Sequence, residues 1–111
     1  MAANDYDLAL EELTRASTMR LLASESFDLP SFAALYDHLG QKAEALKSEH
    51  VISKQILDAL RNAAKAIRNQ APYVTGAREN IALADKFEVL LDLMIIGEGP
   101  RDRAPGVPRI V

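Results

Sequence analysis

Large apolar residues recur at every seventh position through the middle of the chain. The members of this row are Phe32, Leu39, Leu46, Leu60 and Ile67, and the one polar residue that interrupts it is Ser53. A period of seven places side chains on one side of an α-helix, where they pack against a neighbouring helix. The row therefore predicts an all-α fold, arranged as an antiparallel bundle of three or four helices.

The number of helices depends on residues 30–70. Within this segment Pro30 stands at the start, and Gly40 is the one glycine. Because turns are usually marked by glycine or proline, we expect one continuous, supercoiled helix. The alternative breaks this helix in the polar run 47–50, with Ser48 as a new N-cap, and yields four helices of about 20 residues each.

Two further helices flank this segment. The first begins at the N-cap Asn4 and runs to about Ser24, and the last runs from about Gly76 to the stop signal Gly97. Each has a broad apolar face that we expect to point into the core. The first face comprises Tyr6, Ala9, Leu10, Leu13, Ala16 and Leu21, and the last comprises Ala77, Leu83, Ala84, Phe87, Leu90, Leu91 and Met94.

Both flanking helices carry a second, narrower apolar stripe. The stripes consist of Leu8, Met19 and Leu22 on the first helix and of Val89, Leu93 and Ile96 on the last. A helix that is apolar on two sides must be covered on more than one side. Close packing would also be favoured by the small side chains of Ala59, Ala63, Ala64 and Ala66. These features predict a homodimer, with the six stripe residues as its candidate interface.

The chain divides into a helical domain, residues 1–97, and a C-terminal tail, residues 98–111. The tail contains three prolines and three arginines among few large apolar residues. This composition is typical of extended or disordered segments. We therefore expect the tail to contribute nothing to the core.

Composition places the domain among folded proteins and removes several kinds of chemistry. Apolar residues make up 49% and charged residues 26% of the 111 positions, which is the balance of a globular domain. Cysteine is absent, which excludes disulfides, thiolate nucleophiles and cysteine-ligated metals. The sequence shows no secretory leader pattern and no apolar run of about 18 residues, so we expect a cytoplasmic protein without a membrane partner.

The two histidines, His38 and His50, are the first candidates for chemistry. On one helix they would lie about 120° apart, and neither follows a glutamate by three positions as in di-iron bundles. The serines at the start of the second helix have no nearby base and are explained as caps. We therefore expect no metal, no cofactor and no enzymatic activity. Phosphotransfer through either histidine is kept as an alternative.

Four cationic side chains fall within about 60° of one another on their helix, opposite its apolar face. They are Lys54, Arg61, Lys65 and Arg68. Such a row could contact the phosphates of a nucleic acid. However, Asp58 lies beside it and the net charge of the chain is −3, so a solvated polar face explains the row more simply.

Together these patterns predict a non-enzymatic protein-interaction or regulatory module that acts as a homodimer and binds a further protein partner. The alternatives are a nucleic-acid-associated regulator that uses the cationic row and a histidine phosphotransfer protein. Affinity that falls steeply with salt would indicate the first alternative. Acid-labile phosphate on His38 or His50 would indicate the second.

Overall fold

The computed structural model describes residues 3–100, and all regular structure among them is helical. The all-α prediction is therefore confirmed. In chain order the elements are α1 (Leu8–Thr14), the π-helical turn η1 (Arg15–Met19), α2 (Arg20–Ser24), α3 (Leu29–Ala45), α4 (Lys54–Gln70), α5 (Thr75–Glu79) and α6 (Ile81–Ile95).

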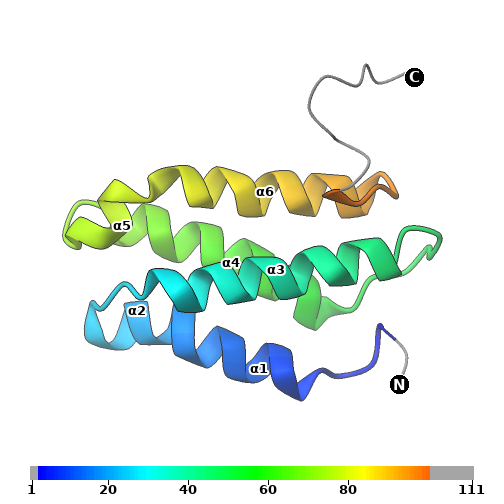
Figure 1. Ribbon diagram of the computed structural model, residues 1–111, viewed down its shortest axis with the longest axis horizontal. Helices are drawn as coiled ribbons and strands as arrows, with labels where there is room; N and C mark the ends of the chain where they lie inside the picture. The colour runs from blue at the N-terminus through cyan, green and yellow to red at the C-terminus, as the bar shows by residue number, and fades with distance from the viewer. Residues whose placement is uncertain (1–2, 101–111) are drawn as a thin grey trace.

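The helices lie side by side as rods, and consecutive long helices run in opposite directions (Figure 1). The elements α1, η1 and α2 follow one another without a gap and form one rod at the lower edge of Figure 1, while α6 forms the upper edge. The most extensive contact joins α4 and α6. The rod of α1, η1 and α2 packs on α3 and α4, and α3 also packs on α6.

The expected continuous helix over residues 30–70 is wrong, because the chain leaves the helix after Ala45 and re-enters it at Lys54. The new N-cap is Ser53, whose side chain accepts a hydrogen bond from the Gln55 amide at 3.1 Å. The turn forms without glycine or proline because the Asn4 side chain makes hydrogen bonds to two backbone groups of the turn. Asn4 Oδ1 accepts from the Ser53 amide and Asn4 Nδ2 donates to the Val51 carbonyl, both at 2.8 Å.

The first helix also differs from expectation at its start. Asp7, not Asn4, caps it by accepting a hydrogen bond from the Leu10 amide at 3.1 Å. Tyr6 consequently lies before the helix and is 61% exposed, although we expected it in the core.

The buried face of this helix includes polar side chains. Leu10 and Leu21 are buried as expected, and Leu13 packs partly buried against the core, but Ala9 and Ala16 are exposed. Ser17 and Thr18 are buried instead, within the π-helical turn, which is wider than an α-helical turn. Ser17 Oγ donates to the Leu13 carbonyl at 2.6 Å, which satisfies one of the two buried hydroxyls.

The core contains all five apolar residues of the row that repeats every seven positions, together with the main face of α6. Its largest side chains are Phe32 and Phe87, whose rings meet edge to face with centroids 6.5 Å apart. The alanines that we associated with a second chain are buried within this core, where they let α4 approach its own neighbours. They are Ala59, Ala63, Ala64 and Ala66.

The expected last helix from Gly76 is divided at Asn80 into α5 and α6. Shortly after α6 ends at Ile95, the expected stop signal Gly97 adopts the left-handed conformation (φ 75°) that favours glycine. The three residues that follow turn back onto α3. Pro100 lies against Gly40, and the buried Gly99 lies against the Glu44 side chain. The rest of the expected tail, residues 101–111, lies outside the described residues, so the domain boundary at Gly97 stays a prediction. None of the described helices combines the length and the apolar character needed to cross a bilayer.

Candidate interaction surface of α4 and α6

The structure separates the six residues of the expected interface. Leu8, Met19 and Leu22 are exposed on the rod of α1, η1 and α2, whereas Val89 and Ile96 are exposed on α6. These elements lie at opposite edges of the bundle (Figure 1). The two stripes therefore do not form one continuous surface on a single chain.

Leu93, the sixth residue, is only 5% exposed. Its side chain is covered by other residues of the same chain. The Glu98 backbone amide donates a hydrogen bond to the Leu93 carbonyl at 2.8 Å. Its side chain is therefore not presented to a second copy. The expected stripe on the last helix consists in the structure of Val89 and Ile96 without their middle member.

The stripe on the first helix is divided by charges. Arg15 pairs with Glu11 at 3.2 Å and also with Glu12. These ion pairs stand between Leu8 and Met19 along the rod. A charged break of this kind makes the stripe a poorer apolar surface than the sequence pattern indicates.

A further exposed aliphatic residue, Ile95, was missed by the sequence patterns. It is 65% exposed and lines an open groove between α4 and α6 with Ile52, Leu57 and Leu91. Arg61 and His50 also line this groove. The spacing of Leu91 and Ile95 is a helical signal, but its partner Leu57 was assigned to a continuous helix, so the groove could not be inferred.

The cationic row does not act as one unit. Arg68 donates hydrogen bonds to Asp85 and Glu88 of α6, each at 2.6 Å, and so links the two helices. The hydrogen bond from Arg68 holds the pKa of Glu88 below its usual value. The ion pairs found within residues 3–100 do not include Lys54, Arg61 or Lys65, which are exposed. Three of the four candidate cations thus remain directed to solvent.

A partly buried polar cluster around Asp7 ties the N-terminal segment to α3 and α4. Asp7 Oδ2 lies 2.7 Å from His38 Nε2 and 2.9 Å from Lys42 Nζ. Because an ionised carboxylate only accepts hydrogen bonds, His38 Nε2 is the donor in this pair. The Asp7 amide donates to Gln55 Oε1 and its carbonyl accepts from Gln55 Nε2, both at 2.9 Å.

The electrostatics of the cluster favour the ionised form of Asp7. Burial raises the pKa of its carboxyl, but the hydrogen bonds from His38, Lys42 and the Leu10 amide outweigh burial. The pKa of Asp7 therefore lies well below its usual range. Sequence patterns do not reveal this cluster, because the side-chain partners of Asp7 lie 31 to 48 positions away.

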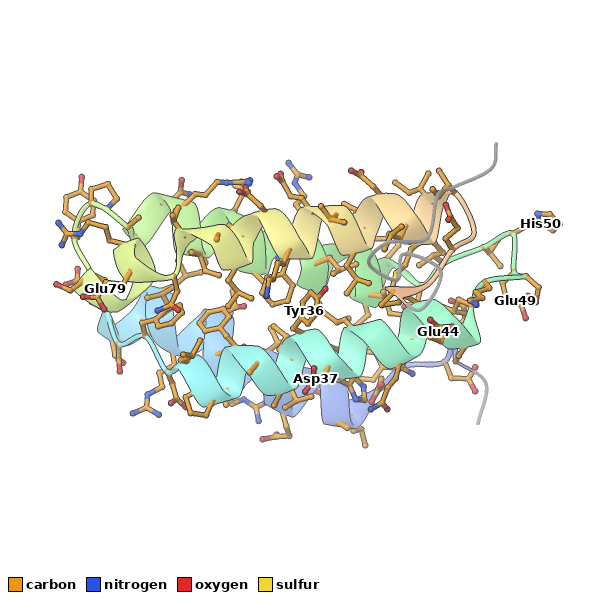
Figure 2. All side chains as sticks on the ribbon, turned by 45° about the horizontal axis from the view of Figure 1, so that its top comes forward. Tyr36, Asp37, Glu44, Glu49, His50 and Glu79 are labelled. Carbon is orange, nitrogen blue, oxygen red and sulfur yellow. The ribbon has the colours of Figure 1, made fainter. Side chains whose placement is uncertain are left out.

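The two histidines occupy different environments. His38 is committed to Asp7 in the cluster, whereas His50 projects from the connection between α3 and α4 at one end of the bundle, beside Glu49 (Figure 2). Glu79 lies at the other end (Figure 2). Within residues 3–100, no three His, Asp or Glu side chains are grouped as they would be to hold a metal ion.

Comparisons with known proteins add no assignment. No protein-family model, no curated protein and no solved structure matches this chain.

Proposed function

We propose that this chain is a non-enzymatic protein-interaction module that acts as a homodimer. The observation that supports it is the exposure of large aliphatic side chains on the last two turns of α6. Ile95 is 65% exposed, and Val89 and Ile96 are each about half exposed. Burying the exposed half of one such side chain in an interface stabilises the assembly by about 1 kcal/mol. A cytoplasmic location stays a prediction from the sequence.

The alternatives receive less support from the geometry. At His38 the Nε2 atom donates to Asp7, so this nitrogen is not free to accept a transferred phosphate. A nucleic-acid surface would lose one of its four cations, since Arg68 is neutralised by Asp85 and Glu88. The remaining cations stand next to an acidic helix, which would repel phosphates.

Sedimentation equilibrium of the full chain tests the proposal. At concentrations on the order of 1 to 100 μM, the range of moderate interfaces, we expect a mass that rises toward twice 12.2 kDa. A single species of 12.2 kDa over the whole range would contradict the proposal.

Two matched variants show which edge of the bundle takes part. Ile95→Ser removes an exposed aliphatic side chain from α6, and Leu22→Ser removes one from α2 at the opposite edge. We expect Ile95→Ser to weaken association and Leu22→Ser to leave it unchanged, with circular dichroism showing that both variants are folded. The reverse result would move the interface to the first helix.

A further inference from the structure

The solvent-facing sides of α4 and α6 carry opposite charges. On α4 the cations follow one another at spacings of seven, four and three positions, which keeps them on one side of the helix. They are Lys54, Arg61, Lys65 and Arg68. On α6 the anions Asp85, Glu88 and Asp92 follow at spacings of three and four. The contact between Arg68 and both Asp85 and Glu88 shows that these two rows face the same side of the molecule.

One charge on each helix departs from this segregation. Asp58, the one acidic residue of α4, lies at the edge of the basic row, where it lines a groove with Lys54 and Arg61 as well as one with Glu11 on the side of α1. Lys86, the one basic residue of α6, lines a groove with Leu29 and Tyr36 on the side of α3. Apart from Asp58 at its edge, the face shared by α4 and α6 is basic along one helix and acidic along the other.

The face has an apolar groove at the end near the α3–α4 connection. Leu57, Leu91 and Ile95 line it between the two helices, together with Arg61, Ile52 and His50. An apolar strip bordered by charged rows is the usual anatomy of a protein interface, with a dry centre and a polar rim. Because one row is basic and the other acidic, the face is complementary to a copy of itself.

We propose that a second copy of this chain docks on this face with α4 of each protomer lying over α6 of the other. This inference rests on the proposed homodimer and names its interface and symmetry. The two-fold axis runs along the groove, parallel to the helices, because this axis exchanges the basic row with the acidic row. The other in-plane axis, across the helices, would place α4 over α4 and bring like charges together.

The symmetry also determines which residues of the two protomers contact each other. A two-fold axis along the groove preserves the height of each residue, so α4 residues of one protomer meet the α6 residues beside which they lie in their own chain. Within one chain Arg68 lies beside Asp85 and Glu88, and Arg61 lies further along beside Leu91 and Ile95. Arg61 of one protomer consequently meets Asp92 of the other.

The size of the face is modest. Helices of 17 and 15 residues form a face about 25 Å long and about 20 Å wide. Such an area is at the lower end of what stable two-chain interfaces bury. Association should therefore depend on concentration and weaken as salt screens the two rows.

Charge reversal tests the pairing in the full chain by sedimentation equilibrium. Arg61→Glu and Asp92→Arg should each raise the dimer dissociation constant about tenfold or more, because each places like charges together. The double variant Arg61→Glu/Asp92→Arg should return it to within about threefold of the original value. The matched controls Lys86→Glu and Asp37→Arg reverse exposed charges elsewhere and should change it little.

The absence of cysteine allows a direct test of the symmetry. Arg61→Cys and Asp92→Cys chains, one of them carrying a tag, are mixed and oxidised with a mild disulfide-forming reagent. We expect disulfides between unlike chains, because α4 lies over α6. A control with Ala82→Cys, on the α3 side of α6, should give few cross-links.

The outcomes distinguish this inference from the proposed function. A monomer at all concentrations contradicts both. A dimer that the charge reversals leave intact supports the proposed function and overturns the interface. Cross-links between Arg61→Cys chains alone would overturn the symmetry, since they require α4 to lie over α4.

Discussion

The face of α1 and α3 and the face of α4 and α6 use charged residues in opposite ways. On the first, Asp7 is held by His38 and Lys42, and Arg15 by Glu11 and Glu12, so charges are paired within the chain. On the second, Arg61, Lys65 and Asp92 point to solvent around exposed aliphatic side chains. This difference supports the proposal that the second face, rather than the first, associates with a partner. Variants on the two faces should therefore change different measurements.

The largest effect is expected at Leu93, which the sequence assigned to the interface and the structure buries. Leu93→Asp places a charge where water is excluded, so the free energy of unfolding should fall by about 3 kcal/mol or more. Ile96→Asp on the same helix is the control and should change it by about 0.5 kcal/mol or less. Urea denaturation measures both. If the Leu93→Asp protein stays folded and is monomeric, Leu93 belongs to the interface and not to the core.

A smaller loss is expected from the Asp7 cluster. Asp7→Ala removes the N-cap of α1 and leaves Lys42 without its carboxylate, which should cost about 2 kcal/mol of the free energy of unfolding. Asp37→Ala, an exposed aspartate of α3, is the control. If the comparison of the two faces is correct, Asp7→Ala leaves the dimer dissociation constant unchanged at temperatures where the protein is folded.

The same carboxylate gives the fold a defined response to acid. Because the pKa of Asp7 is lowered in the folded state, its contribution is complete above the pKa of an unfolded aspartate, about 4, and is lost as pH falls below it. The stability difference between the native protein and Asp7→Asn should therefore narrow between pH 5 and pH 2. Denaturant unfolding at several pH values measures it, and a constant difference would contradict the assignment.

The smallest effect is expected from the ion pair that links α4 and α6. Arg68→Gln should change the melting temperature by a few degrees at most, because exposed pairs contribute little, and by less at high salt. The pKa of Glu88 should rise toward its usual value, because the hydrogen bond that lowers it is gone. Carboxyl NMR titration measures this shift, and an unchanged Glu88 pKa would show that the pair does not persist in solution.

The sequence was sufficient for the fold class but not for the helix boundaries. Burial of the row from Phe32 to Ile67 follows from spacing alone. The break after Ala45 does not, because the residue that holds the turn, Asn4, lies 47 and 49 positions from its hydrogen-bond partners. Ser53 in fact marks the new helix, since the one polar member of the apolar row is its N-cap.

The candidate surface could be predicted only in part. Of the three stripe residues on the last helix, Val89 and Ile96 are exposed in the single chain and Leu93 is buried, because periodicity does not show which side a neighbouring segment covers. The groove at Ile95 requires knowledge that α4 lies beside α6. The charge segregation was hidden because only the basic row was considered, without the acidic row that faces the same side.

The contacts of Asn4 and Asp7 also set an order for folding during synthesis. Both residues leave the ribosome almost 50 positions before Ser53 and Gln55, their partners in the turn and in α4. The first rod can therefore dock on α3 early, where His38 and Lys42 bind Asp7, but the contacts with residues 51–55 form only after α4 has begun to emerge. The side of α4 that contacts α6, its most extensive neighbour, is covered only when α6 has emerged. A nascent chain halted before α6 would expose that side, which is where a chaperone would be expected to bind.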